Sequence, residues 1–388
     1  MLAVAPVTSL KLWLILILAV VLLTPLTHAS LRRVVLALLN LLFVWFCVGA
    51  LLPAVLVGLL LIYTLLRFAR GRHAGAAGGL VLAVGIGTLF VLHKLPPLAA
   101  WAGLSALNPL LAGIGFSYVM LRVVDVWRAV RGGLQPAPGL IALTNYLLPF
   151  HMLAAGPIQA YEDFVRQPPV PPPPDAEGVL QAVERIVAGL FKKFVLADLL
   201  CQLFSTGWNG TGWYLWLEVN LHFLWLYLDF SAYSDIAVGC GRLLGLNTPE
   251  NFNRPYLARN LTEFWERWHI TLSQFIRRHL FVPLQMALLR RTDGRHALPS
   301  AGVAIAVSFL LCGAWHGLTP AFLAWGSLHA AGLIACALYR EWLRRRLSPA
   351  ALARYQADPL IRGAAVFATY QFVALSLWLV GDQWKPGW

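Results

Sequence analysis

The chain of 388 residues is 59% hydrophobic and only 12% charged, with a mean hydropathy of +0.69. A soluble domain carries about 25% charged residues, so this composition excludes a chain surrounded by water and predicts a helical bundle that fills a lipid bilayer. The formal net charge of +13 does not indicate a partner nucleic acid, because the basic residues cluster in short loops between apolar runs, where cytoplasmic loops and anionic lipid head groups account for them.

The five cysteines stand apart from one another, at Cys47, Cys201, Cys240, Cys312 and Cys336. Their odd number and the lack of any C-x-x-C pair argue against a disulfide framework and against a cysteine-based metal site. Each lies in an apolar run, where a cysteine is usually a small core residue. We expect no metal and no permanently bound cofactor.

Apolar runs of spanning or near-spanning length recur along the chain. They cover residues 10–27, 34–51, 54–66, 75–92, 98–121, 139–155, 187–205, 213–230, 298–315, 321–338 and 363–381. A helical crossing needs ~20 residues. Several runs are shorter, so some segments are expected to re-enter the membrane under protein cover. The sequence thus predicts an all-α, polytopic transmembrane helical bundle of about 10–12 membrane segments.

Basic residues predict the orientation of these runs. Pro53 separates two runs whose outer ends carry arginines, which favours a hairpin with both ends in the cytoplasm. The arginine clusters in residues 290–295 and 340–346 should also face the cytoplasm. The turn that holds His316 should then lie on the opposite side. Between residues 139 and 260 the charge bias is weak, and the orientation stays open.

Residues 260–283 are charged and aromatic in an otherwise apolar chain, and they predict an amphipathic helix. Asn260 and Glu263 resemble a capping box, Glu263 and Arg267 are spaced for an ion pair, and Pro283 marks an expected stop. One face of this helix would carry Trp265, Trp268, His269, Leu272, Phe275 and Ile276. Two interpretations stay open: an interfacial helix anchored at the head groups, or a helix that points its histidine into the bundle.

His316 ends an apolar run and lies between Gly313 and Gly317, which leave room around its ring. Ionisable groups in membrane segments are functional candidates, and histidine titrates near neutrality, as a general base must. A hydrogen-bonded structural histidine is an equally good interpretation of the residue alone. The structural interpretation is stronger for His329, as it is for His151 and His222.

Several motifs together resemble the membrane-bound O-acyltransferase (MBOAT) family, and within it the alginate O-acetyltransferase branch, which is similar to the teichoic-acid D-alanyl transfer protein. The longest matches are Asp229-Phe230-Ser231-Ala232-Tyr233-Ser234-Asp235, Pro249-Glu250-Asn251-Phe252-Asn253-Arg254-Pro255-Tyr256 and Glu263-Phe264-Trp265-Glu266-Arg267-Trp268-His269. Shorter matches are Asp125-Val126-Trp127-Arg128, Ala155-Gly156-Pro157-Ile158, Gly189-Leu190-Phe191-Lys192-Lys193 and Trp315-His316-Gly317. The resemblance implies N-terminal transmembrane helices in residues 1–112, a catalytic core in 113–338, and a basic loop with a C-terminal transmembrane helix in 339–388.

The resemblance also implies a chemistry. It makes His316 the catalytic residue and His269 the second histidine of the site. The donor would be an acyl thioester reached from the cytoplasm, either acetyl-CoA or an acyl carrier protein. The acceptor would be a hydroxyl of an exported polysaccharide or of a periplasmic or extracellular partner protein. This implies an O-acetyltransferase of the bacterial cytoplasmic (inner) membrane. The chain departs from the family at residues 318–321, where an aromatic residue is usual.

Residues that would contact the donor follow from the same matches. Asn253, Tyr256 and Trp265 are expected to line its path. Two basic pairs, Lys192 with Lys193 and Arg277 with Arg278, are expected to meet donor phosphates, although charged flanks of membrane segments explain them equally well. The alternative function is a channel or carrier for an acyl-bearing or lipid-linked precursor, without catalysis of its own.

Overall fold

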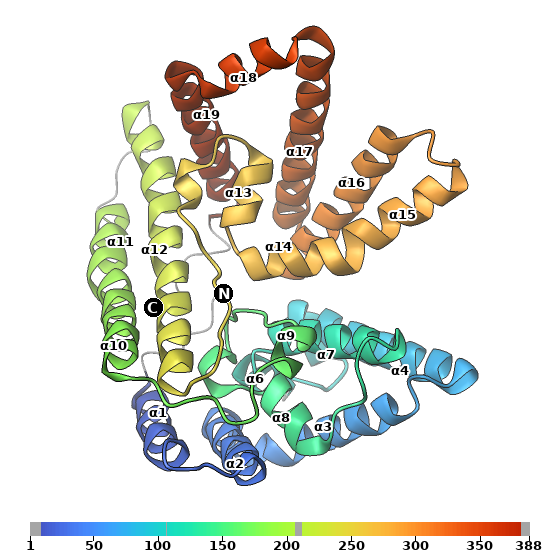
Figure 1. Ribbon diagram of the computed structural model, residues 1–388, viewed down its shortest axis with the longest axis vertical. Coiled ribbons are helices and arrows are strands. Elements are labelled where there is room, and N and C mark those ends of the chain that lie inside the picture. Colours follow the sequence, from blue (N-terminus) through green and yellow to red (C-terminus); the bar gives the residue numbers. More distant parts are fainter. Residues whose placement is uncertain (1–8, 106, 206–211, 382–388) are drawn as a thin grey trace. The chain divides into compact units, whose positions relative to one another are not determined.

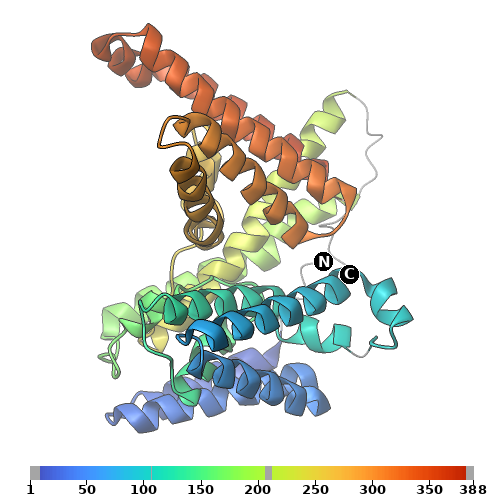
Figure 2. The same ribbon diagram turned by 90° about the vertical axis from the view of Figure 1, so that its right-hand side faces the viewer.

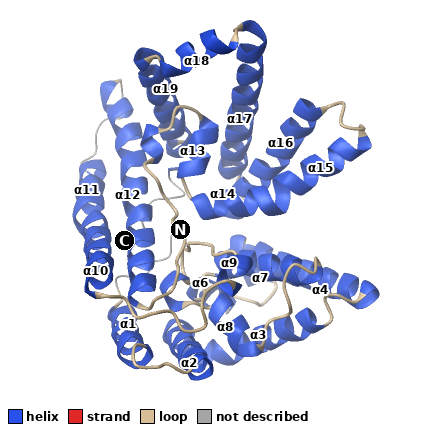
Figure 3. Ribbon diagram, in the orientation of Figure 1, coloured by secondary structure: helices blue, strands red, loops and turns tan. Residues whose placement is uncertain are grey.

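The computed structural model describes residues 9–105, 107–205 and 212–381, which form helices joined by loops (Figures 1 and 3). No strand occurs in these ranges, and the predicted all-α class is confirmed. Five described segments are long and apolar enough to cross a membrane: Ala29–Arg67, His73–Lys94, Ala297–His316, Pro320–Arg346 and Pro359–Trp378. A sixth span results if Leu107–Gly113 and Phe116–Arg131, bent by 69°, cross together. The protein is a polytopic helical membrane protein, with fewer full-length spans among the described residues than the apolar runs suggested.

The chain divides into two compact units, which we call the N-terminal unit (residues 2–190 and 233–249) and the C-terminal unit (residues 191–232 and 250–388). This division follows packing and differs from the three segments that the resemblance implied, which stay a prediction. Helix α12 (Trp213–Leu243) contributes its first part to the C-terminal unit and its last turns to the N-terminal unit.

The N-terminal unit holds α1 (Leu10–Leu23), α2 (Ala29–Val48), α3 (Leu52–Arg67), α4 (Arg72–Lys94), α5 (Pro96–Trp101), α6 (Leu107–Gly113), α7 (Phe116–Arg131), α8 (Leu140–Leu147), α9 (Tyr161–Val165) and nearly all of α10 (Ala176–Phe191). The C-terminal unit holds α11 (Asp198–Ser205), α13 (Leu261–Arg267), α14 (Ile270–Ile276), α15 (Val282–Arg291), α16 (Ala297–His316), α17 (Pro320–Arg346), α18 (Pro349–Ala357) and α19 (Pro359–Trp378). Two π-helical turns, Lys192–Ala197 and Arg277–Phe281, lie between helices of the C-terminal unit.

Buried polar side chains fix the loops of the N-terminal unit. Arg122 on α7 is 0% exposed, and its guanidinium donates to three carbonyl oxygens within residues 147–157. Asp125, one turn later, accepts the main-chain N–H of Tyr161 at 2.6 Å. Such bonds satisfy backbone groups that no helix satisfies. The matched motifs around residues 125–128 and 155–158 therefore serve the packing of this unit.

The C-terminal unit brings α16 and α17 into close packing (Figures 1 and 2). Gly313 on α16 and Gly326 on α17 face each other, and a side-chain carbon on either would collide with the main-chain carbonyl of Phe322 or Phe309 across the interface. Small residues permit such close approach of membrane helices. Helix α18 joins the far ends of α17 and α19 (Figure 1).

One of the predicted apolar segments is divided differently in the structure, and another is divided where expected. The run 98–121 is not one helix, because α5, α6 and α7 share it and Gly115 takes a positive φ of +59° before α7. Pro53 does lie at the junction of its two runs, as predicted, directly after the break. It lies in the first turn of α3, where its fixed φ is tolerated, and the break falls at the 3₁₀ turn Gly49–Leu51.

The single amphipathic helix predicted over residues 260–283 is wrong. The segment forms α13, α14 and a π-helical turn, because His269 adopts φ +43° and interrupts the helix. Pro283 lies in the first turn of α15 instead of ending a helix. The expected cap is confirmed, since Asn260 Oδ1 accepts the Glu263 N–H at 3.0 Å, and so is the ion pair of Glu263 with Arg267 at 2.6 Å.

Candidate active site

His316 is the last residue of α16, where the chain turns into α17. Gly317 is extended at φ −174°, and Thr319 is the N-cap residue of α17, which begins at Pro320. This short connection folds Phe322 and Trp325 back onto the histidine. The half-buried imidazole stacks on Phe322 at 5.9 Å between ring centroids and meets Trp325 edge-on at 5.4 Å. His316 therefore lies in an aromatic wall that its own helix hairpin builds.

His269 is buried, with 2% of its surface exposed, and Asn251 holds its ring. The Nδ1 atom lies 3.1 Å from Asn251 Oδ1, which also accepts the main-chain N–H of Thr271 at 3.2 Å. A backbone N–H is always a donor, so the Asn251 atom is an acceptor and Nδ1 of His269 carries the proton. Burial lowers the pKa of His269 from 6.5 to about 3. The ring is therefore neutral near pH 7, with the lone pair on Nε2.

A chain of aromatic rings connects the two histidines. Trp315 contacts both, with ring centroids 4.7 Å from His316 and 6.4 Å from His269. The burial of His269 favours the interpretation in which its segment points a polar group into the bundle. The resemblance implied that His316 and His269 belong to one site, and their shared contact with Trp315 is consistent with this.

Trp265 lies in the same cluster, through α13. Its indole N–H donates to Nδ1 of His329 at 3.3 Å, and its ring packs against Phe309 and Trp325. His329 Nε2 is 2.9 Å from the hydroxyl of Ser376 on α19. The cluster therefore ties α13, α16, α17 and α19 together, and Trp265 serves it as a packed, hydrogen-bonded wall residue.

The other expected donor-contacting residues lie elsewhere in the same unit. Tyr256 meets Tyr227 edge-on at 5.4 Å. Asn253 is exposed, and its main chain bonds with Arg267. Lys193 forms an ion pair with Asp229 on α12.

The remaining basic residues flank π-helical turns. Lys192 begins one such turn and is partly buried, whereas Arg277 and Arg278 begin the other and are exposed. Arg278 donates to His279 at 3.2 Å. Insertions of this kind often occur at functional sites. Neither this contact nor that of Lys193 involves the cluster around His316, so a role for the four basic residues stays a prediction.

Sequence reasoning missed four residues of this cluster. They are Asn251, Trp325, Ser376 and, as a cluster member, His329. Asn251 stood in a matched motif, and that was its only signal. Nothing in the sequence distinguishes Trp325 and Ser376 from the other aromatic and small residues of the apolar runs. Within the described residues, no group of three His, Cys, Asp or Glu side chains could hold a metal ion.

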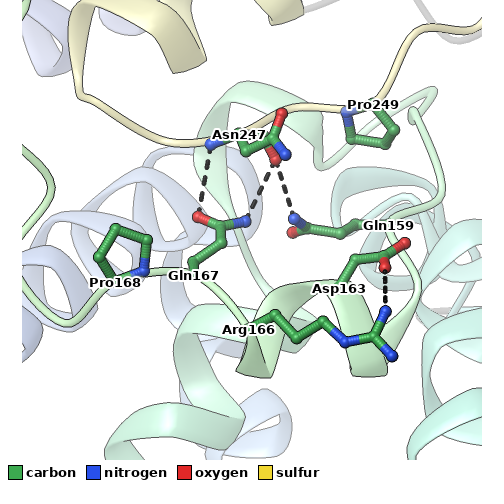
Figure 4. A pocket seen from close by; sticks show the side chains of 7 residues that line it. All are labelled: Gln159, Asp163, Arg166, Gln167, Pro168, Asn247 and Pro249. Carbon is green, nitrogen blue, oxygen red and sulfur yellow. Dashed lines mark hydrogen bonds and ion pairs between the residues drawn. The ribbon is translucent and has the colours of Figure 1, made fainter.

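A separate pocket lies wholly within the N-terminal unit (Figure 4). Its volume is about 260 Å³, and it is lined by Gln159, Asp163, Arg166, Gln167, Pro168, Asn247 and Pro249. Gln159 and Gln167 both donate to the carbonyl oxygen of Asn247, at 2.9 and 3.1 Å. The pocket is smaller than the roughly 300–1,000 Å³ of typical ligand sites. Its two glutamine amides bind the loop that follows α12 to the segments on either side of α9, and we assign the pocket to packing.

Residues 27–379 match the sequence model of the membrane-bound O-acyltransferase (MBOAT) family. The chain belongs to this family. The match includes both histidines and every residue of the aromatic cluster, so the site described above lies inside the MBOAT region.

Curated relatives carry three different names. A teichoic acid D-alanyltransferase of Streptococcus thermophilus is 28% identical, over 69% of this chain and 68% of its own length. A probable alginate O-acetylase, AlgI, of Pseudomonas aeruginosa is 31% identical, over 58% of this chain and 42% of its own. A peptidoglycan O-acetyltransferase of Helicobacter pylori is 35% identical, over 40% of this chain and 29% of its own. The chain thus spans about two thirds of the first relative and less than half of the other two.

Proposed function

We propose that the protein is a membrane-embedded O-acyltransferase that moves an acyl group, in our proposal acetyl, from a thioester donor to a hydroxyl acceptor. The observation that carries the proposal is His316, an imidazole at the end of an apolar helix, placed in an aromatic cluster that also contains the buried His269. Family membership supports the reaction class. The names of relatives support acceptors of the polysaccharide or teichoic-acid kind.

The reaction follows from the chemistry of a neutral imidazole. His316 accepts the proton of the acceptor hydroxyl while the hydroxyl oxygen attacks the thioester carbonyl carbon. The carbon–sulfur bond then breaks, and the imidazolium returns its proton to the leaving thiolate. Proton transfer of this kind contributes typically 10²–10⁴-fold. Phe322 and Trp325 give the imidazole apolar neighbours, and an apolar surrounding disfavours hydrolysis of the donor by water.

His269 has a supporting part in this proposal. With its proton on Nδ1, held by Asn251, the Nε2 atom can accept a hydrogen bond but cannot donate one. A neutral ring of this tautomer suits orientation of the donor or acceptor through an N–H or O–H group. It does not suit polarisation of the thioester carbonyl, which requires a donor.

The remaining assignments complete the proposal. The donor is acetyl-CoA or an acyl carrier protein that arrives from the cytoplasm, and Lys192, Lys193, Arg277 and Arg278 meet its phosphates. Tyr256 and Asn253 line its path. The acceptor is an exported polysaccharide or an acyl-accepting partner protein outside the cytoplasm. The protein resides in the bacterial cytoplasmic (inner) membrane, as its basic loops favour.

Purified protein in lipid nanodiscs, incubated with labelled acetyl-CoA and a hydroxyl acceptor, tests the proposal. We expect His316→Ala to lower transfer by two to four orders of magnitude, about 3–5 kcal/mol in the barrier. The matched control is His296→Ala, an exposed histidine just before the other end of α16 with no side-chain cap bond. A His316→Ala protein that transfers within about threefold of the wild-type rate, under ~1 kcal/mol, would replace catalysis with the channel or carrier alternative.

A further inference from the structure

Trp325 packs directly against the proposed base. Its ring meets the His316 imidazole edge-on, with 5.4 Å between centroids and 88° between planes. The side chain is 4% exposed, and its indole Nε1 has no hydrogen-bond partner among the described residues. Indole nitrogen can only donate. A buried donor without an acceptor costs about 1–3 kcal/mol, so its presence beside a reactive group calls for a functional reason.

The neighbouring histidine on α17 cannot supply the missing acceptor. His329, one turn later on α17, lies with its ring centroid 4.7 Å from that of Trp325. Its Nδ1 accepts the N–H of Trp265, so in the neutral ring Nε2 carries the proton and donates to Ser376 Oγ. The Ser376 hydroxyl in turn donates to the carbonyl oxygen of Val373 at 2.8 Å.

This chain of bonds runs in one direction and uses both nitrogens of His329. Protonation of His329 would place two N–H donors against each other at Trp265, so the ring is not a proton carrier. Because Trp265 already occupies the only acceptor that His329 offers, Trp325 keeps an unused N–H. The same bonds hold α13, α17 and α19 together, so the indole of Trp325 is rigidly placed.

We propose that Trp325 is a further catalytic residue, whose indole N–H donates to the carbonyl oxygen of the acyl thioester as negative charge develops there. This inference rests on the proposed acyl transfer and adds to it the group that stabilises the oxyanion. When hydroxyl oxygen adds to the carbonyl carbon, the carbonyl π electrons move to its oxygen, and they return when the carbon–sulfur bond breaks. A fixed donor in an apolar surrounding stabilises such charge more strongly than water does.

The decisive pair of variants is Trp325→Phe and Trp265→Phe. Both remove an indole N–H from the same aromatic cluster, but only the Trp265 N–H is bonded in the resting protein. We expect Trp325→Phe to lower kcat by about 10²–10³-fold, with the KM for acetyl-CoA and the pH–rate profile unchanged. We expect Trp265→Phe to lower the melting temperature more and kcat less, because it leaves His329 without its donor.

Replacement of Trp325 by 3-benzothienylalanine, which has the shape of tryptophan but no N–H, guards against a packing defect in the phenylalanine variant. A loss of kcat in this protein supports the inference. A kcat within about threefold of wild type in either variant at position 325, or a kcat loss no larger than that of Trp265→Phe, overturns it. If His316→Ala remains active in the same assay, the proposed function fails instead, which separates the two failures.

Discussion

Replacement of Asn251 by alanine should be among the most damaging single changes to the C-terminal unit. Asn251 is 1% exposed, and its side-chain oxygen accepts from three donors: the main-chain N–H of Thr271 at 3.2 Å, the Thr271 hydroxyl at 2.8 Å, and Nδ1 of His269 at 3.1 Å. Alanine removes this acceptor. The main-chain bond from Ile270 N–H to the Asn251 carbonyl survives, because it does not involve the side chain.

The size of the effect follows from counting the donors that lose their acceptor. The Thr271 hydroxyl can rotate, but the Thr271 main-chain N–H and the His269 ring N–H are fixed. Each buried donor left without a partner costs about 1–3 kcal/mol, so the free energy of unfolding should fall by about 2–6 kcal/mol. Most single substitutions cost about 1 kcal/mol. Denaturant unfolding in detergent micelles, followed by tryptophan fluorescence, measures the difference.

Asn253→Ala is the matched control for stability. Asn253 lies two residues further on, is exposed, and bonds Arg267 only through its main chain in the contacts described. Its replacement should change the free energy of unfolding by less than about 0.5 kcal/mol. If Asn251→Ala were no more destabilising than Asn253→Ala, the assignment of Asn251 as the acceptor that fixes His269 would be wrong.

Two further predictions concern the α16–α17 crossing and pH. Gly313→Ala should destabilise the protein by about 1–3 kcal/mol, because the added methyl group collides with the Phe322 carbonyl. The control is Gly302→Ala on the same helix, where the space around the glycine is open. In parallel melting curves this control should be neutral or stabilising by up to about 1 kcal/mol. Burial lowers the pKa of His269 to about 3, so below pH 6.5 the unfolded chain binds a proton at this residue that the folded chain does not bind. The free energy of unfolding should therefore fall as pH drops from about 6.5 toward 3, by at most about 1.4 kcal/mol per pH unit. His269→Asn keeps a donor for Asn251, tolerates the positive φ and should make this dependence less steep; an equally steep slope in that variant would assign the effect to other groups.

Much of the fold could be predicted because hydropathy constrains membrane helices strongly. The apolar runs around α16, α17 and α19 match the observed helices to within a few residues at their starts, and the Asn260 cap was visible in the sequence. In a bilayer every backbone polar group must be satisfied within the protein, so an apolar run has few alternatives to a helix. Local signals therefore sufficed wherever local bonding decides the structure.

The break at His269 could not be predicted from local signals. Residues from Trp265 to Ile276 have helical spacing, and all of the expected face is buried, yet α13 ends at Arg267. The cause lies elsewhere in the chain, at Asn251, whose main-chain carbonyl and side-chain oxygen capture the N–H groups of Ile270 and Thr271. These are the first N–H groups of α14, which have no partner within their own helix. A long-range acceptor therefore decides where this helix begins.

The candidate site could be predicted only in part, for the same reason. The motifs supplied His316 and His269, but what surrounds them depends on contacts between distant positions: Trp265 with His329, 64 residues apart, and His329 with Ser376, 47 residues apart. No periodicity within one helix records such pairs. The close approach of Gly313 and Gly326 is what lets Trp325 reach His316, so two glycines with no chemistry of their own determine which aromatic ring faces the proposed base. A histidine motif thus identifies the proton acceptor, whereas the groups that would stabilise charge around it follow only from the packing of the helices.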